Sequence, residues 1–281
     1  MTTTDAQCVS EYTTDDRFHQ STGEDLMKCF NKYDMTHKKR GVAYIFNNEN
    51  FQHSELKTRL GSSKDAEDFK KALIKLGFHK DDINLYTDAT AEEMCGALKQ
   101  FGKKNSHPDL DCFICAILSH GDSDDLIYGY DDVVKLDKLL SYLRPGCCPS
   151  LTGVPKLFFV QASRGSKIDF GIEKTDADLL RNRERAPKIP VMADMLVVYS
   201  SCNEYPSFGN KEGGSWFMQA LSKILMKYGN EYEIMKLLTA VSNYVASLGF
   251  QSSDNSEYNG NKQMPQIMST LIKELKFQSK N

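Results

Sequence analysis

From about residue 41, short apolar runs alternate with stretches in which apolar residues recur every three to four positions. The short runs are typical of buried strands, and the periodic stretches are typical of amphipathic helices. Strands are predicted at residues 41–47, 83–86, 110–118, 156–162, 195–200 and 267–277, and helices at residues 65–76, 90–101, 133–143, 215–228 and 232–248. Buried strands separated by helices predict an α/β fold in three layers, in which a central, mostly parallel sheet of about six strands has helices on both faces.

Two segments show no packing period. Residues 1–35 are polar and are predicted to be a short, flexible leader. Residues 173–188 are rich in charges, which is typical of a solvated loop. The expected organisation is therefore a leader, a first region at residues 36–172, a linker at residues 173–188, and a second region of the same domain at residues 189–281.

The 281 residues carry a formal net charge of −3 and are 40% hydrophobic, which fits a folded globular protein rather than a disordered one. The run Lys38-Lys39-Arg40 is too short to form the basic face that nucleic-acid binding requires. No apolar run approaches the roughly 18 residues that span a membrane, and the first residues lack the pattern of a signal peptide. We therefore expect neither a nucleic-acid partner nor a membrane contact.

The eight cysteines show no spacing typical of a disulfide framework, so we expect reduced thiols in a cytoplasmic protein. Cys112 and Cys115 have the C-x-x-C spacing of some metal sites. Both lie within one predicted strand, where residues three apart point to opposite faces. The pattern favours two packed cysteines over a metal site, and the sequence predicts no metal and no cofactor.

Polar residues follow two of the predicted strands at the point where each strand ends. Ser119-His120-Gly121 comes after the strand at 110–118, and Ser163-Arg164-Gly165 comes after the strand at 156–162. The carboxyl ends of parallel strands meet at one rim of a sheet, where α/β proteins bind their ligands. We therefore expect the side chains of His120 and Ser163 to face one cleft.

Seven short motifs, in the same order and across residues 35–277, resemble the caspase family. They are Thr58-Arg59-Leu60-Gly61, Ser119-His120-Gly121, Leu151-Thr152-Gly153-Val154-Pro155-Lys156-Leu157, Gln161-Ala162-Ser163-Arg164-Gly165, Ile189-Pro190-Val191, Gly214-Ser215-Trp216-Phe217 and Lys262-Gln263-Met264-Pro265. The fourth matches the family signature Q-A-C-[RQG]-G, except that Ser163 stands in place of the cysteine. His120 lies upstream at close to the spacing of about 50 residues that accompanies the signature. The short leader makes the chain similar to the executioner type.

The resemblance implies a caspase-like sandwich and a cytosolic endopeptidase that cuts after aspartate and is processed from a zymogen. In that family a cysteine attacks the peptide carbonyl, a histidine transfers protons, and two backbone N–H groups hold the oxyanion. On this chain His120 matches the histidine, Gly121 belongs to the oxyanion site, and Ser163 occupies the nucleophile position. The candidate processing sites are Asp176 and Asp178, which lie in the linker.

The resemblance also implies a pocket in which two arginines and a glutamine grip the aspartate carboxylate. Arg59 and Gln161 match two of these positions, and Ser207 lies in the loop that supplies the third. Gly209 stands where the second arginine is expected, with only Lys211 nearby. Losing an arginine that hydrogen-bonds a charged ligand weakens binding by about 10- to 150-fold.

Two losses in separate segments favour a catalytically inactive caspase homologue. A cysteine is partly ionised at neutral pH, whereas a serine hydroxyl needs a well-oriented general base. Such a pseudoenzyme would regulate a paralogous caspase in apoptosis, either by pairing with it through the closing strand at residues 267–277 or by drawing away caspase-inhibitor proteins. Pairing with a second copy along that strand is equally open. So are two enzymatic interpretations: a weak Ser–His hydrolase, and an active aspartate-specific cysteine endopeptidase whose cysteine has been replaced.

Four of the candidate residues also have a structural alternative. His120 would cap a backbone group, Arg59 would be a solvated loop arginine, and Asp176 and Asp178 would be ordinary solvating charges. For the activity itself, the sequence predicts that Ser163→Cys alone does not restore cleavage, because the pocket also needs Gly209→Arg.

Overall fold

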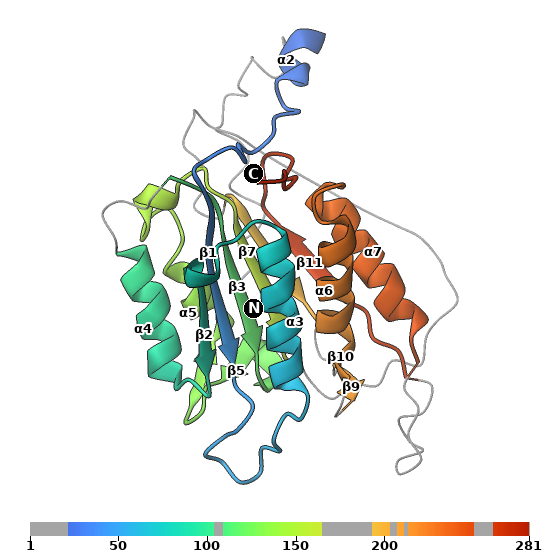
Figure 1. Cartoon of the computed structure of the whole chain (residues 1–281). Coiled ribbons are helices and arrows are strands. Elements are labelled where there is room, and N and C mark those ends of the chain that lie inside the picture. The colour runs from blue at the N-terminus through green and yellow to red at the C-terminus, as the bar shows by residue number, and fades with distance from the viewer. Residues whose placement is uncertain are drawn as a thin grey trace, which may run out of the picture.

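The computed structural model describes residues 22–103, 109–164, 193–202, 207–210, 213–249 and 261–280. Its central sheet has six strands in the order β11–β8–β7–β3–β1–β2 (Figure 1). The strands are β1 (Lys39–Asn47), β2 (Ile83–Thr87), β3 (Leu110–Leu118), β7 (Lys156–Gln161), β8 (Met195–Tyr199) and β11 (Gln266–Ser269). All neighbours are parallel except β11, which is antiparallel to β8. The predicted mostly parallel sheet is confirmed.

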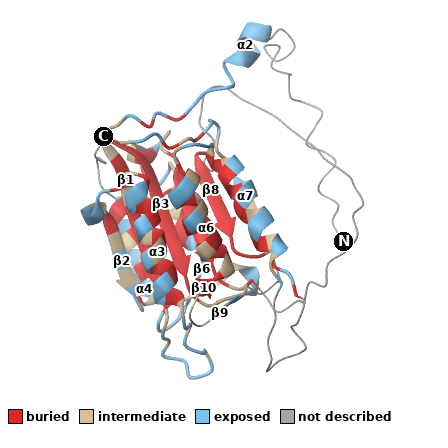
Figure 2. Cartoon of the chain, turned by 45° about the vertical axis from the view of Figure 1, so that its right-hand side comes forward, coloured by how far each residue is buried: buried red, intermediate tan, exposed pale blue. Residues whose placement is uncertain are grey.

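Helices cover both faces of this sheet. Helices α3 (Ser62–Lys75), α6 (Trp216–Tyr228) and α7 (Ile234–Ser247) lie on one face, and α4 (Ala91–Gly102) and α5 (Leu136–Ser141) lie on the other (Figure 1). Figure 2 shows the strands buried between these two layers. Cys112 packs into the cluster on the α3 side and Cys115 into the cluster on the α4 side, so the two thiols point to opposite faces as predicted.

Smaller elements frame the carboxyl ends of the strands. A three-stranded sheet is formed by β4 (Gly121–Asp122), β5 (Leu126–Tyr128) and β6 (Val133–Lys135), and a ribbon by β9 (Gly209–Asn210) and β10 (Gly214–Ser215). Single 3-10 turns occur at Lys80–Asp82, Ser123–Asp125 and Pro149–Leu151. The helix predicted at residues 133–143 is therefore wrong in its first turn. The β-branched pair Val133-Val134 pairs with β5 instead.

The closing strand is much shorter than the predicted span of 267–277. It ends at Ser269, after which the chain crosses the edge of the sheet and buries Leu275 and Phe277 in the core cluster on the α3 side. The alternation that predicted one long strand therefore has two causes: a short edge strand, and core contacts made by a segment without strand structure.

The predicted boundary between the leader and the folded domain, at residue 35, is also wrong. Helix α2 (Gly23–Met27) projects from the body of the molecule (Figure 1). Tyr33 and Met35, in contrast, are buried in the core, and the Tyr33 N–H donates to the carbonyl of Glu274 over 2.9 Å. The folded domain thus begins before residue 35. Residues 1–21 lie outside the described part of the chain.

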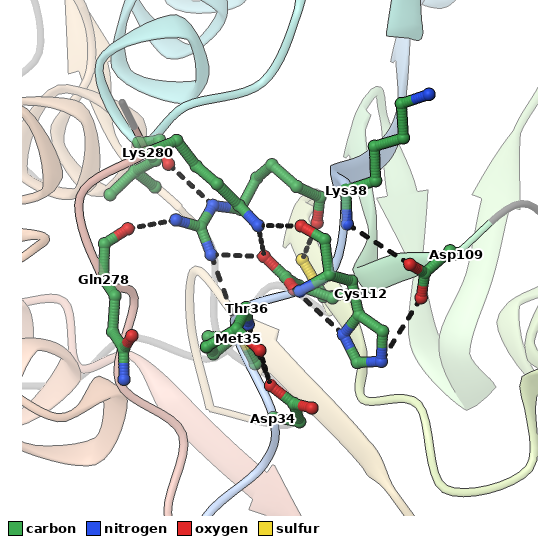
Figure 3. A network of polar contacts seen from close by, with 12 residues as sticks. Asp34, Met35, Thr36, Lys38, Asp109, Cys112, Gln278 and Lys280 are labelled. Carbon is green, nitrogen blue, oxygen red and sulfur yellow. Dashed lines mark hydrogen bonds and ion pairs between the residues drawn. The ribbon is translucent and has the colours of Figure 1, made fainter.

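At the amino ends of β1 and β3, a buried ion pair lies in a network of polar contacts that reaches Gln278 and Lys280, near the end of the described chain (Figure 3). Arg40 donates to the Asp111 carboxylate over 2.6 Å, and both side chains are fully buried. Lys280 approaches the same carboxylate at 2.8 Å, and Arg40 also donates to the carbonyl of Gln278. The run Lys38-Lys39-Arg40, which is too short to form a basic face, therefore includes a core residue.

Candidate active site

The carboxyl ends of β3 and β7 bring His120 and Ser163 to one rim of the sheet. The two strands are parallel neighbours, with Leu118 opposite Gln161. A Cβ atom added to Gly121 would lie 2.4 Å from the carbonyl oxygen of Ser163, so the segments that follow the two strands are in direct contact. The position of Gly121 thus requires a residue without a side chain.

A cleft of about 290 Å³ opens at this rim. It is lined by Thr58, Arg59, Leu60, Ser62, Asp65, Ser119, His120, Gln161, Ser163, Ser207, Phe208, Gly209, Gly214 and Ser215. Six of the candidate residues therefore share one cleft: Arg59, His120, Gln161, Ser163, Ser207 and Gly209. Asp176, Asp178 and Lys211 lie outside the described residues.

The imidazole of His120 is oriented by two groups that the sequence did not reveal. Its Nε2 lies 2.7 Å from the carbonyl oxygen of Lys57, and its ring lies 4.8 Å from that of Phe51. A carbonyl only accepts hydrogen bonds, so Nε2 carries the proton and Nδ1 is left as the basic nitrogen of the neutral ring. Burial lowers the pKa of His120, and the charge of Arg59 lowers it further. The histidine is therefore set up as a neutral base beside Ser163, but its orienting partner is a carbonyl rather than a carboxylate.

We expect this lowered pKa to make the protein less stable in mild acid. A histidine whose folded-state pKa lies below its unfolded value binds its proton more readily when unfolded, so stability falls as the pH drops below about 6.5. Between pH 7.5 and 5.5, the melting temperature of the wild-type protein should fall further than that of His120→Gln. The exposed His79 provides the control, because His79→Gln should follow the wild-type curve. Parallel curves for wild type and His120→Gln would contradict the assignment.

Arg59 is fixed at the side of the cleft by hydrogen bonds to its own neighbourhood. Its Nη1 donates to the carbonyl of Asn48 over 3.1 Å and to the hydroxyl of Ser62 over 2.5 Å. Burial lowers the pKa of Arg59 to about 10, with Asp65 and Glu49 opposing the shift, so the side chain remains a cation at neutral pH. It is not the solvated loop arginine of the structural alternative.

Gly209 leaves no room for the arginine that the resemblance places there. It pairs with Ser215 across the β9–β10 ribbon. A Cβ atom at this position would lie 2.8 Å from the Cα of Ser215 and 2.9 Å from the carbonyl oxygen of Gly214. Both contacts are with backbone, so any side chain at 209 requires the ribbon to open.

Asp65 holds this ribbon in place, and sequence reasoning missed it. Its carboxylate accepts hydrogen bonds from the N–H of Ser215 at 2.9 Å and from the amide of Gln219 at 3.0 Å. Gly214 has φ of 82°, and a Cβ there would lie 2.2 Å from an Asp65 oxygen. Burial raises the pKa of Asp65. In the sequence this residue looks like one more acidic group in the first turn of a helix, so no local pattern identifies it.

Arg164 connects the nucleophile position to the edge of the sheet. Its Nε donates to Asp125 over 2.8 Å, its Nη1 donates to the amide oxygen of Gln266 over 2.5 Å, and its guanidinium lies 3.9 Å from the ring centre of Tyr199. Gln266 is the first residue of β11. Arg164 directly follows Ser163, so its side chain connects the edge strand to the segment that contains the nucleophile position.

Comparison with known proteins identifies the fold and its family. The family model for the Caspase domain matches residues 40–276. The chain belongs to the caspase family. It is 42% identical to Caspase-7 of Gallus gallus over 88% of this chain and 80% of that protein, and 39% identical to Caspase-3 of Bos taurus over 87% of both chains.

The solved structures give the same result for the caspase fold. The crystal structure of Caspase-1 from Spodoptera frugiperda superposes with a TM-score of 0.80 at 37% identity, covering 89% of this chain and 96% of that chain. The caspase-like three-layer sandwich expected from the sequence is therefore confirmed. The roles that the resemblance assigns to His120, Gly121 and Ser163 stay predictions, as do those of the pocket residues.

Proposed function

We propose that this member of the caspase family is a pseudoenzyme that regulates an active caspase in apoptosis by binding it. The observation that carries the proposal is Ser163, which stands at the nucleophile position in the cleft that also contains His120. A serine hydroxyl is essentially un-ionised at neutral pH, and serine proteases overcome this with a base that a buried carboxylate orients. Nε2 of His120 has a carbonyl as its partner, so Ser163 lacks that support.

The second support is the pocket. An aspartate-specific site needs enough cationic donors to hold a desolvated carboxylate. Among the described lining residues, Arg59 is the only arginine or lysine. The β9–β10 ribbon lies close to Gly209, within 3 Å of where a Cβ atom would be, so there is no empty space in which an arginine could stand.

The edge strand supports the proposed binding role. β11 pairs with β8 on one side, and among the described residues no strand pairs with its other edge. Met264, Met268 and Ile272, on and beside this strand, are 45%, 39% and 50% exposed. An open strand edge flanked by apolar side chains is a surface that proteins normally cover by pairing. A related caspase has the same edge in the same fold, which makes edge-to-edge pairing geometrically simple.

Pairing would act on the active partner through a hydrogen bond that this chain also contains. Here Arg164, the residue after Ser163, donates to Gln266 of β11. An equivalent contact in an active partner would couple its edge strand to its catalytic cysteine. A subunit that binds the active arrangement of the partner more tightly than the inactive one raises its activity without chemistry of its own.

The proposed compartment is the cytoplasm. None of the seven described cysteines forms a disulfide with another, which is typical of a reducing environment. In the described part of the chain, no helix has both the length and the apolar character to cross a membrane.

Mixing this protein with a purified active caspase from the same organism tests the role. We expect the partner's cleavage rate and melting temperature to change at micromolar concentration, and the two proteins to co-elute. Met268→Glu and Ile272→Glu place a charge on the exposed apolar surface and should abolish the effect while the variant stays folded. Met226→Glu on α6, where the side chain is 43% exposed, is the matched control and should retain it.

The variant Leu271→Glu would test folding rather than binding, because Leu271 packs partly against the core. No co-elution, together with an unchanged rate and melting temperature of the partner, would rule out the pairing mechanism. If this chain instead sequesters caspase-inhibitor proteins, the partner's cleavage rate should change only when such an inhibitor is added. Self-pairing would instead give a dimer of this chain alone.

A further inference from the structure

The segment before the folded domain carries an exposed apolar cluster. Leu26, Met27 and Phe30 are 55%, 68% and 78% exposed, the three highest values among the large apolar side chains of the described residues. Phe30 lies four positions after Leu26 and three after Met27, so the three side chains share one side of α2 and the turns that follow it. Single exposed apolar side chains are ordinary, but such a cluster marks a surface that another molecule covers. Residues 22–30 are called the arm below.

The root of the arm is fixed beside the segment that follows β11. The Tyr33 N–H donates to the carbonyl of Glu274 over 2.9 Å, and the Glu274 N–H donates to the carbonyl of Asn31 over 2.8 Å. The buried Tyr33 hydroxyl donates to Asp194 over 2.8 Å and accepts from the N–H of Ile272 over 3.2 Å. From this root α2 projects beyond the end of the sheet (Figures 1 and 2).

The direction of β11 decides which part of a partner the arm would meet. β11 runs antiparallel to β8, and its last residue, Ser269, lies opposite Leu196 near the start of β8. It therefore begins at the carboxyl-end rim, which contains the cleft, and ends at the opposite rim, where the arm is rooted. Symmetric pairing of two such edges is antiparallel, so the end of one β11 lies beside the start of the other. The arm is thereby directed at the carboxyl-end rim of the partner.

The arm is long enough to reach that rim. Leu26 lies seven positions before Tyr33. Seven residues span roughly 10 Å as a helix and roughly 23 Å when extended, compared with about 4.8 Å between paired strands. The arm can therefore pass the partner's edge strand. A caspase of the same fold has the same rim, which in this chain carries Met264, 45% exposed, two residues before β11.

The edge strand alone is too small for a stable pair. Stable interfaces bury roughly 800 Å² on each partner, from about 20–30 residues. β11 has four residues. A pairing through β11 therefore needs further surface, and the arm supplies apolar side chains directly beyond the end of the strand.

We propose that Leu26, Met27 and Phe30 pack against the carboxyl-end rim of an active caspase that pairs with this chain through β11. The inference rests on the proposed function and adds a second contact surface to it. The edge strand reaches the partner only at the side of its sheet, whereas the arm lies against the rim that contains the partner's cleft. Packing there restricts the segments that border the cleft, which gives the pairing a direct route to the partner's cleavage rate.

The double variant Leu26→Ser with Phe30→Ser tests the arm. Both side chains lie outside the core, so the melting temperature should stay that of the wild-type protein. In sedimentation velocity with a purified active caspase from the same organism, the full-length variant should bind at least about tenfold more weakly than the wild type, because apolar interface surface has been removed. The matched control is Ile74→Ser with Leu85→Ser, where the side chains are 47% and 44% exposed on α3 and β2. The control should bind like the wild type.

Hydrogen exchange in the partner locates the contact. With the wild-type protein, exchange should slow in the partner's closing strand, in the segment before it, and in the loops at the carboxyl ends of its parallel strands. The arm variant, added at a concentration that saturates the partner, should still slow exchange in the closing strand but not at the rim.

Equal binding by the wild type and the arm variant would overturn the inference, and so would weaker binding with unchanged protection of the rim. In both cases the pairing through β11 stands. No binding by the wild-type protein would instead end the pairing proposal, and the inference with it. A dimer of the wild-type protein alone that the arm variant fails to form would assign the arm to a second copy of this chain and overturn the choice of an active caspase as partner.

Discussion

The wild-type protein should cleave an aspartyl tetrapeptide reporter no faster than buffer does, and Ser163→Cys should raise the rate only partly. The thiol supplies the nucleophile that the site lacks, since a neutral His120 with a free Nδ1 is available to accept its proton. The pocket remains short of one arginine, so kcat/KM should stay about 10- to 150-fold below that of a caspase with a complete pocket. His120→Ala in the Ser163→Cys background should remove the activity that was gained.

Strong cleavage by Ser163→Cys alone would contradict this expectation. It would mean that Gly209 does not limit the pocket and that the serine stands in an otherwise working peptidase. Measurable cleavage by the wild-type protein, lost on Ser163→Ala, would instead identify a weak Ser–His hydrolase.

The structure changes what the second reversion should do. The sequence alone predicts that Ser163→Cys with Gly209→Arg restores activity. The backbone of Gly214 and Ser215 lies within 3 Å of the place where the new Cβ would be, so the β9–β10 ribbon must open to admit any side chain. We therefore expect the double variant to recover activity only in part and to melt below Ser163→Cys. Gly209→Ala, which adds the Cβ alone, should reproduce the loss in melting temperature. Full recovery without such a loss would show that the ribbon opens freely.

The features that the sequence predicted correctly depend on local chemistry. The strand at Leu110–Leu118 was predicted to the residue because both of its faces are buried, which makes every position apolar except Asp111. The start of α4 lies within one residue of the predicted start at residue 90, and a capping box fixes it: Thr90 accepts from the N–H of Glu93 at 3.1 Å, and Glu93 accepts from the N–H of Thr90 at 2.8 Å.

The features that were missed depend on contacts between distant segments. The alternation at residues 267–277 did not reveal that only four residues pair with β8, because Leu275 and Phe277 are apolar for a different reason, their burial against the helices. Arg40 follows two lysines in the sequence, and its burial depends on contacts with the distant residues Asp111 and Gln278.

The candidate site shows the same difference between features set by local sequence and features set by contacts with distant segments. Strand-end reasoning placed His120 and Ser163 in one cleft because parallel strands align their carboxyl ends. The carbonyl of Lys57 orients His120, and a backbone group has no signature in a sequence. The close approach of the ribbon to Gly209 was equally invisible, because a glycine in the sequence does not say how near the neighbouring backbone lies.

Removing the carboxylate of Asp111 should be the most destabilising single change among those considered. Asp111 is fully buried and accepts from Arg40 at 2.6 Å and from Lys280 at 2.8 Å, and it also accepts the N–H of His37 at 2.9 Å (Figure 3). Asp111→Ala leaves the Arg40 guanidinium buried without a counter-ion, and burial already lowers the pKa of Arg40. Breaking a buried pair in this way costs about 3–5 kcal/mol, a large part of the stability of a typical domain.

Urea unfolding at pH 7.5 measures this cost, and the neighbouring Asp109 provides the matched control. The Asp109 side chain is 65% exposed, so Asp109→Ala should change the unfolding free energy by less than about 1 kcal/mol. The double variant Arg40→Met with Asp111→Leu removes both charges and should recover most of the loss, because an apolar pair can replace a buried ion pair. Because Arg40 also binds the Gln278 carbonyl, hydrogen exchange in residues 272–280 should accelerate in Asp111→Ala before the rest of the sheet opens. A loss no larger than that of Asp109→Ala would mean that the ion pair is dispensable and that the packing of Leu275 and Phe277 alone holds the end of the chain in place.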